Sequence, residues 1–301
     1  MTVNEVGLRD GLQNERVVVS TENKLSLINA LIAAGVRNFE VASFVSPKAV
    51  PQMADAAALY DVLPSKDAIH YSALVPNLKG YERAAEAGAR SVALVLAASD
   101  TMNRKNINMS LEQTVAACGE VIRRAVKDGI ESRCYISGLF LCPFEGEIPD
   151  ERIVDLATSM LTVGANEVII ADPLGVANPA RVSVLFDRLA AVLDLGKISA
   201  HYHDTRALGL ANVWAALQSG VRKFDSSIGG LGGCPFAPQA SGNLATEDLV
   251  LMLSQCGFKT GIDVGKLREA VKVAGGMVGR SLGGRTMSWL ESRSDLLPIT
   301  Y

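Results

Sequence analysis

Two histidines stand one residue apart in the stretch Ile198-Ser199-Ala200-His201-Tyr202-His203-Asp204-Thr205, in a chain that has three histidines in all. Helical patterns flank the stretch on both sides, which predicts that it is a β-strand. Alternate side chains of a strand point to one face, so His201 and His203 are expected to point the same way. Imidazole nitrogens beside a carboxylate suit a divalent metal ion. The spacing therefore favours a metal site over two unrelated polar residues.

Short β-type runs alternate with amphipathic helical patterns along the whole chain. Eight runs are predicted as strands, at residues 3–6, 38–41, 69–74, 91–96, 132–138, 167–171, 199–203 and 223–227. Helical patterns cover residues 22–34, 79–87, 111–127, 150–163, 179–193, 206–219 and 245–256. Four of the helices run into a glycine directly before the next strand, at positions 35, 88, 164 and 220. Eight such units predict an α/β fold, a (β/α)8 TIM barrel.

The whole chain, residues 1–301, is expected to form a single domain. The barrel would cover about residues 1–260, and one or two further helices would follow over residues 261–301. The alternative fold is a doubly wound sheet, which normally carries a glycine-rich phosphate-binding turn after its first strand. The segment Gly7-Leu8-Arg9-Asp10-Gly11 does not have that pattern. The barrel is therefore favoured.

Composition excludes several classes of function. The net charge is −3 and acids and bases are interspersed, so the sequence does not favour binding to nucleic acid or to a membrane surface. The apolar runs are too short to span a bilayer, and a strand is predicted almost at the N-terminus, so we expect a cytoplasmic protein. Five cysteines without a Cys-x-x-Cys pair argue against a disulfide framework or a zinc ribbon.

In a (β/α)8 barrel the active site lies at the C-terminal ends of the strands. Polar residues that suit catalysis follow or end five of the predicted strands: Arg9-Asp10 and Gln13, Glu40, Asp172, His201 and His203, and Asp225. These side chains converge only if the fold is a barrel. Their distribution therefore supports both the barrel and a metal site at its mouth.

A glycine-rich loop, residues 229–243, follows the last predicted strand and contains Cys234. A long, conformationally free loop at the mouth of a barrel is a candidate lid. From such a lid the Cys234 thiol would act as acid, base or nucleophile. Asn243, at the end of the loop, would offer its side-chain oxygen to the metal.

Several segments together resemble 3-hydroxy-3-methylglutaryl-CoA lyases, from Glu5 to at least Leu253. They are residues 7–15, Ser43 to Lys48, Pro51 to Met53, Lys105 to Asn108, His201 to Thr205, and Gly229 to Asp248. The Arg-Asp pair and the His-x-His-Asp motif mark the wider superfamily of metal-dependent lyases and Claisen-type synthases. The Gly-Gly-Cys-Pro loop and the Gln-Asn-Glu triplet after the first strand are specific to the lyase branch.

The resemblance implies a site residue by residue. Mg²⁺ or Mn²⁺ would be held by Asp10, His201, His203 and Asn243. Arg9 would face the thioester carbonyl of an acyl-CoA substrate, with Gln13 beside it, and Cys234 would be the reactive thiol. The remaining acidic positions are Glu40 and Asp172, which would support the catalytic site, and Glu247 and Asp248, which would orient Arg9 or the lid. The resemblance also implies a homodimer.

The implied reaction cleaves the bond between the carbinol carbon and the α-carbon of the thioester. The tertiary hydroxyl must lose its proton, either to a carboxylate or to His201, and an enolate must be stabilised. A chelated divalent ion acidifies that hydroxyl, and a guanidinium suits the developing enolate oxygen. The thiol of Cys234 would then protonate the enolate to acetyl-CoA.

Three short segments depart from the pattern of the family. Ala49 replaces a bulky aromatic residue, Arg206-Ala207 replaces a Tyr-Gly pair, and Pro173 replaces a threonine. Each lies near the expected mouth of the site, so a related branched 3-hydroxyacyl-CoA remains an alternative substrate.

Four other functions are less favoured. A Claisen-type synthase that condenses acetyl-CoA with a 2-oxo acid usually has a further regulatory domain and lacks the cysteine-bearing loop, and a pyruvate-type aldolase is still less favoured. A metal-barrel hydrolase would need more histidines, and only His70 is left. A non-catalytic binding protein would not need the arginine, the ligands and the thiol together. Incubation with Mg²⁺ and the CoA thioester would separate these functions.

Overall fold

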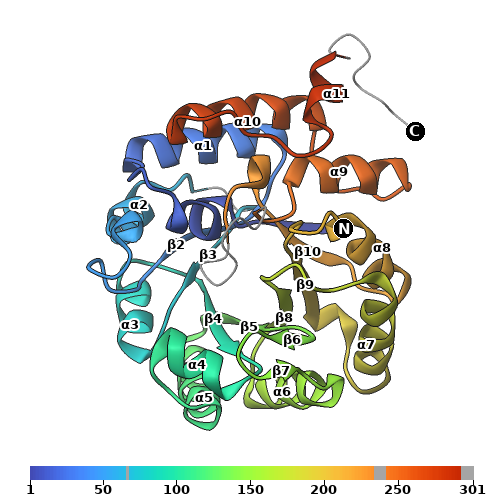
Figure 1. Ribbon diagram of the computed structural model, residues 1–301. Helices are drawn as coiled ribbons and strands as arrows, with labels where there is room; N and C mark the ends of the chain where they lie inside the picture. Colours follow the sequence, from blue (N-terminus) through green and yellow to red (C-terminus); the bar gives the residue numbers. More distant parts are fainter. Residues whose placement is uncertain (66–67, 234–241, 293–301) are drawn as a thin grey trace.

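Eight parallel strands close into a barrel in this computed structural model, which describes residues 1–65, 68–233 and 242–292 (Figure 1). Around the barrel the strands follow the order β1-β10-β9-β8-β5-β4-β3-β2. Their bounds are β1 Thr2–Glu5, β2 Asn38–Ser43, β3 His70–Leu74, β4 Ser91–Ala97, β5 Glu131–Ser137, β8 Glu167–Asp172, β9 Ile198–Tyr202 and β10 Lys223–Ser226. The predicted (β/α)8 barrel is confirmed, and each strand lies within a few residues of its predicted position.

Helices surround the barrel on all sides (Figure 1). They are α1 Thr21–Ala34, α2 Ala56–Val62, α3 Leu78–Glu86, α4 Asp100–Ile107, α5 Leu111–Asp128, α6 Asp150–Val163, α7 Pro179–Val192, α8 Gly209–Gln218 and α9 Thr246–Gln255. Two helices follow, α10 Val264–Val278, which packs along α1, and α11 Met287–Ser292. The glycines at positions 35, 88, 164 and 220 all have positive φ. They therefore end their helices as the sequence predicts.

Some elements had no counterpart among the predicted ones. Helices α2 and α4 are additions, and a small antiparallel hairpin, β6 Leu141–Cys142 and β7 Gly146–Glu147, lies between β5 and α6. Short 3₁₀ turns are η2 Leu12–Asn14, η3 Pro51–Met53, η4 Leu195–Lys197 and η5 Ile228–Gly230. In the described part of the chain no helix is long and apolar enough to cross a membrane.

Helix α8 begins at Gly209, three residues later than the prediction from Arg206. The reason lies in the preceding turn, where Ala207 has a φ of 58°. This left-handed conformation cannot continue into a right-handed helix, and it costs a residue with a Cβ atom about 1–2 kcal/mol. The strain falls at the position where the family resemblance leads us to expect glycine.

Replacing Ala207 with glycine should therefore stabilise the protein. Ala207 is exposed, so packing hardly changes, and we expect the free energy of unfolding to rise by about 0.5–1 kcal/mol. Denaturant unfolding measures this difference. The control is Ala116→Gly at an exposed position within α5, which should lower the free energy of unfolding by about 0.5–1 kcal/mol. A loss of stability in both variants would contradict the assignment of strain at Ala207.

The main hydrophobic core lies between the strands and the surrounding helices. The barrel interior is different, because its separate apolar cluster consists only of Ala93, Tyr135, Ile169 and Ala171, with Leu74 and Val95 against it. Much of the remaining interior is polar, with Glu40, His201 and Asp225 buried and Arg133 partly buried. The centre of the barrel thus carries charged groups that require partners, and those partners organise the site described next.

Candidate active site

Arg9 and Asp10 lie on a short π-helical turn, η1, Gly7–Gly11. Both residues follow β1, which ends at Glu5, and do not lie in the strand itself. The backbone N–H groups of Arg9, Asp10 and Gly11 all point to the carbonyl oxygen of Val6, at 3.1, 2.8 and 3.2 Å. Such π-turns are rare and occur frequently at functional sites. This turn places both side chains beside the ends of the strands.

Close packing explains the glycines at both ends of this turn. A Cβ atom on Gly7 would lie 2.5 Å from Oε1 of Glu5, and one on Gly11 would lie 2.9 Å from the Cβ atom of Leu231. Larger residues would push the turn away from these neighbours. The two glycines are therefore required by contacts with β1 and with the glycine-rich loop.

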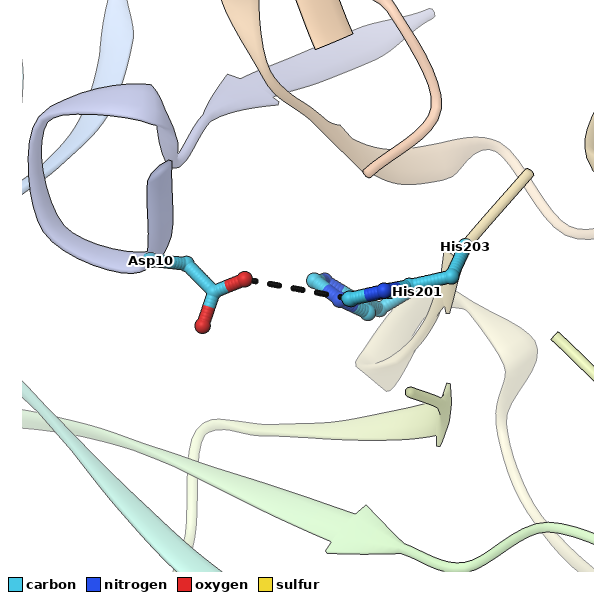
Figure 2. A group of neighbouring side chains, drawn as sticks. All are labelled: Asp10, His201 and His203. Atoms are coloured by element: carbon cyan, nitrogen blue, oxygen red, sulfur yellow. Dashed lines mark ion pairs between the residues drawn. The ribbon is translucent and has the colours of Figure 1, made fainter. Parts of the chain in front are cut away.

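Three of the four predicted metal ligands form one cluster. Asp10, His201 and His203 each offer a ligand atom within 4.8 Å of the others. Figure 2 shows the carboxylate of Asp10 facing the two imidazole rings, and the distance from its Oδ2 to Nε2 of His203 is 3.9 Å. The expectation that the two histidines share a face is therefore confirmed by the geometry.

Asn243 joins this cluster through the backbone. It forms an isolated β-bridge with His203, and its Nδ2 donates to Oδ2 of Asp10 at 2.7 Å and to the carbonyl oxygen of Leu231 at 3.1 Å. All four predicted ligands are thus brought together from three separate parts of the chain.

The residues of this cluster fit a divalent ion. Within the described residues, Nδ1 of His203 and Oδ1 of Asn243 are buried and have no hydrogen-bond partner, which is costly unless something else meets such atoms. Burial, with the charge of His201, lowers the pKa of His203 to about 4, so the ring is neutral near pH 7 and has a free lone pair. Burial raises the pKa of Asp10, but the charges of Arg9, His201 and His203 and the hydrogen bond from Asn243 together lower it further, so the net shift is downward.

Arg9 is held between two carboxylates. Its Nε donates to Oε1 of Glu40 and its Nη1 donates to Oδ1 of Asp10. Burial lowers the pKa of Arg9, but these two negative charges raise it well above its ordinary value. Among the described residues, Nη2 has no acceptor. One edge of a fixed cation is therefore left for a substrate oxygen.

Tyr135 connects Glu40 to the other side of the site. Its hydroxyl oxygen lies 2.7 Å from Oδ2 of Asp225 and 3.2 Å from Oε2 of Glu40. The guanidinium of Arg9 lies 5.7 Å from the centre of the Tyr135 ring. Glu40 therefore helps to fix the guanidinium of Arg9. Its catalytic role stays a prediction.

Asp172 has its carboxylate turned to the loop that follows β8. Its Oδ1 and Oδ2 accept from the backbone N–H groups of Val176 and Ala177, at 3.0 and 2.7 Å. Burial raises the pKa of Asp172, although these bonds and the charge of Arg206 oppose it. Arg206 in turn donates to the carbonyl oxygens of Gly175 and Val176. The structure thus shows Asp172 shaping a loop, and a catalytic role for it stays a prediction.

Glu247 and Asp248 do not orient Arg9, which corrects one of the two predicted roles. Oε2 of Glu247 accepts from the N–H of Gly229 at 3.0 Å, and its Oε1 accepts from the N–H of Gly284 at 2.6 Å. Asp248 accepts from the backbone N–H groups of Arg285 and Thr286. Both residues lie in the first turn of α9, and the carboxylates that contact Arg9 are those of Glu40 and Asp10 instead. They join the first residue of the glycine-rich loop to the C-terminal segment.

Glu5 is a supporting residue that the sequence did not indicate. Its Oε1 accepts from the N–H groups of Gly7 and Ile228, at 2.7 and 2.9 Å, and its Oε2 accepts from the hydroxyl of Thr246 at 2.6 Å. One fully buried carboxylate therefore ties together the π-turn, the start of the glycine-rich loop and the start of α9.

The stability of the protein should report on Glu5. Burial, with the nearby charge of Glu247, raises the pKa of Glu5 from 4.5 to about 7. Between these values the folded protein binds the proton more tightly than the unfolded chain. The contribution is thus complete below about pH 4.5 and is lost as the pH rises to 7. A shift of this size amounts to about 3 kcal/mol.

Glu5→Gln should remove this dependence. The free energy of unfolding of the variant relative to wild type should rise with pH, because only the wild-type protein loses stability as Glu5 ionises. Denaturant unfolding at pH 5 and pH 8 measures the difference. A constant gap between the two proteins would show that Glu5 is ionised throughout this range.

Two predicted residues remain. Gln13 lies half-buried on η2 directly after the π-turn, and its contact with substrate stays a prediction. Cys234 lies outside the described residues, as does most of the predicted lid. The role of the thiol therefore also stays a prediction.

Asp225 and Tyr135 are the functional neighbours that sequence reasoning left without a role. Asp225 stood out only as an acid in the last strand, and its contact with Nδ1 of His201, at 3.2 Å, depends on the pairing of β9 with β10. Nothing in the sequence indicated a role for Tyr135, because an aromatic residue in a buried strand is expected to be part of the hydrophobic core.

A (β/α)8 barrel with a candidate metal centre and a buried arginine at the C-terminal ends of its strands is typical of metal-dependent carbon–carbon lyases and related enzymes. Family comparison agrees with this class, since the HMGL-like family model matches residues 1–273. The chain belongs to the HMGL-like family.

Individual relatives are similar over nearly their whole length. The hydroxymethylglutaryl-CoA lyase of Bacillus subtilis is 41% identical, over 97% of this chain and 98% of the relative. The hydroxymethylglutaryl-CoA lyase of Pseudomonas mevalonii is 43% identical, over 93% and 91%. An HMG-CoA lyase from Acenitobacter baumannii, solved in complex with coenzyme A and 3-methylmalate, superposes with a TM-score of 0.92 at 38% identity, over 99% of this chain and 97% of that one. The resemblance stated from the sequence is therefore confirmed.

Proposed function

We propose that this protein cleaves 3-hydroxy-3-methylglutaryl-CoA to acetyl-CoA and acetoacetate. The observation that carries the proposal is the position of Asp10. One of its oxygens accepts from Arg9, and the other faces His203 and Asn243. A fixed cation and a set of nitrogen and oxygen ligands therefore adjoin the same carboxylate. This is what a reaction that joins hydroxyl activation to enolate stabilisation needs.

A divalent ion held by Asp10, His201, His203 and Asn243 would supply the Lewis acidity that makes the tertiary hydroxyl easier to deprotonate. The chain's own contribution to charge stabilisation is Arg9. Glu40 and Asp10 hold its guanidinium before substrate arrives, so little reorganisation is needed when negative charge develops on the thioester oxygen. The N–H groups of Nη2 are the ones left to donate to that oxygen.

The hydrogen bonds of His201 narrow the choice of base. Its Nδ1 lies 3.2 Å from Oδ2 of Asp225, and as a donor there it leaves only Nε2 with a lone pair. That nitrogen cannot both bind an ion and accept the hydroxyl proton. The ligand role of His201 therefore favours a carboxylate as the base.

A polar cavity beside Asn243 suits the coenzyme. It has a volume of about 470 Å³ and is lined by Asn243, Asp204, Arg280 and Arg285 among others. The two arginines are each more than half exposed, with partial neutralisation by Glu15 and Asp204. They would meet the negative phosphates of a CoA ester while its acyl end reaches Arg9.

The finer properties of the protein are also proposals. Ligands that are two imidazoles, a carboxylate and an amide oxygen suit Mg²⁺ or Mn²⁺. The family resemblance supports a homodimer, which the native mass in solution would test. The cytoplasmic location stays a prediction from the sequence.

Substrate selectivity tests the proposal against its nearest alternative, a lyase for a related branched 3-hydroxyacyl-CoA. Ala49 is exposed in the turn before η3, where the family often has a bulkier side chain. A panel of 3-hydroxy-3-alkylglutaryl-CoA esters should be assayed for release of acetyl-CoA. Among these thioesters, 3-hydroxy-3-methylglutaryl-CoA should have the highest kcat/KM. A clear preference for a longer alkyl group would favour the alternative.

A further inference from the structure

A polar well opens at the N-terminal end of the barrel, opposite the candidate active site. It has a volume of about 380 Å³ and is lined by residues at the starts of the strands, including Asn4, Ser91, Arg133, Glu167 and Lys223. In (β/α)8 barrels this end normally serves stability rather than catalysis. Charged side chains, however, continue from this well into the interior of the barrel.

Charges of alternating sign lead from the well to a candidate metal ligand. Nζ of Lys223 lies 2.9 Å from Oε2 of Glu167, and Oε1 of Glu167 lies 2.7 Å from Nη2 of Arg133. That same Nη2 lies 3.3 Å from Oδ1 of Asp225. The other oxygen of Asp225, Oδ2, lies 3.2 Å from Nδ1 of His201. We call the series Lys223, Glu167, Arg133 and Asp225 the charge column.

Burying the side chains of the charge column costs free energy, so the column needs an explanation other than stability. The side chains of Arg133 and Glu167 are each 13% exposed and that of Asp225 is fully buried. Buried ion pairs are often no better for stability than apolar residues of similar size. A stability role alone therefore gives a weak reason for charges along the barrel axis.

We propose that the charge column is a positioning device that fixes the tautomer of His201, so that Nδ1 carries the proton and Nε2 is free to bind the metal. Asp225 is the positioning residue that contacts the histidine. Arg133 acts through it, by holding the carboxylate with one oxygen toward the well and the other toward His201. The inference rests on the proposed metal role of His201, but not on the identity of the substrate.

The donors around Asp225 show why its charge matters. Oδ1 accepts from Nδ2 of Asn4 at 3.0 Å and from Arg133, while Oδ2 accepts from His201 and from the hydroxyl of Tyr135. A carboxylate has an acceptor oxygen for each side. An asparagine has only one, and its NH₂ group must face the other side.

In an Asp225→Asn variant the amide oxygen should face Arg133. Arginine can only donate, whereas the Tyr135 hydroxyl can rotate and His201 can change tautomer. The amide NH₂ would then donate to Nδ1 of His201, which moves the ring proton to Nε2. The nitrogen needed for the metal would carry a proton, although the shape of the site is almost unchanged.

Nitrogen NMR of the histidine side chains shows directly which ring nitrogen of His201 carries the proton, since the chain has only three histidines to assign. At a pH at which the ring is neutral, the metal-free wild-type protein should show His201 protonated at Nδ1 alone, and Asp225→Asn should show it protonated at Nε2 alone. Titration with Mn²⁺ should give an affinity about 10–100-fold lower for the variant, as expected when the partner of a ligating histidine is lost. Retention of the Nδ1–H tautomer with wild-type Mn²⁺ affinity would overturn the proposal.

Arg133→Met tests the column if Asp225→Asn does not fold, because it leaves the contact with His201 in place. Mn²⁺ affinity should fall, though less than with Asp225→Asn, and unchanged affinity would overturn the role of the column. Ser91 lines the same well but is not part of the charge column. The variant Ser91→Ala should therefore bind Mn²⁺ with wild-type affinity. None of these measurements uses a CoA ester. A chain that fails to cleave the proposed substrate would therefore still test the column.

Discussion

Replacing Arg9 with methionine should lower kcat by at least about 10²–10³-fold and leave KM nearly unchanged. The reason is that the free edge of the guanidinium meets charge that appears on the thioester oxygen only as the carbon–carbon bond breaks. Arg9→Lys should fail almost as badly, because a lysine cannot contact Glu40, Asp10 and a substrate oxygen at once. Steady-state kinetics with the metal-loaded protein measures both constants.

The variant needs a control for the buried carboxylate that it leaves behind. Glu40 is fully buried, and without Arg9 its charge is stranded, which destabilises the fold. The double variant Arg9→Met, Glu40→Gln removes that charge and should show the same loss of kcat. Arg280→Met, in the cavity proposed for CoA, should instead raise KM. A normal kcat with a raised KM in Arg9→Met would make Arg9 a substrate anchor.

His203→Ala should lower the affinity for Mn²⁺ by more than the roughly 10–100-fold that follows loss of a ligand's supporting partner. His203 faces Asp10 from a buried position, and its neutral ring offers a lone pair that no other described residue uses. Alanine removes that ligand without introducing a charge. The dissociation constant is obtained by titration with Mn²⁺, in which the paramagnetic signal of the free ion is monitored.

His70→Ala is the matched control, because His70 is exposed at the start of β3, at the other end of the barrel. Its Mn²⁺ affinity should equal that of wild type. Equal affinities for His203→Ala and wild type would show that the ion binds elsewhere, and the proposed ligand set would then be wrong.

The barrel was predictable because its signals are local. Helices ending at Gly35, Gly88, Gly164 and Gly220, each followed by an apolar run, are features of a few neighbouring residues. The spacing of His201 and His203 is equally local, since it follows from the alternation of a strand. The start of α8 was mispredicted because the strain at Ala207 has no sign in the hydrophobic pattern.

The supports of the site were not predictable, because they depend on contacts between distant segments. The π-turn needs glycine at positions 7 and 11, because a Cβ atom there would collide with Glu5 or with Leu231. Asp225 reaches His201 only once β9 and β10 are paired. Glu247 was expected to orient Arg9 or the lid, and its partners Gly229 and Gly284 became clear only when the C-terminal segment was placed.

One incubation tests the proposed function most directly. The purified protein is mixed with 3-hydroxy-3-methylglutaryl-CoA, with added Mn²⁺ or with a chelator, and acetyl-CoA and acetoacetate are both quantified. We expect the two products in equal amounts, only when metal is present, and almost none from Arg9→Met. A folded protein that binds Mn²⁺ at Asp10, His201 and His203 and yet leaves the ester intact would contradict the proposed reaction.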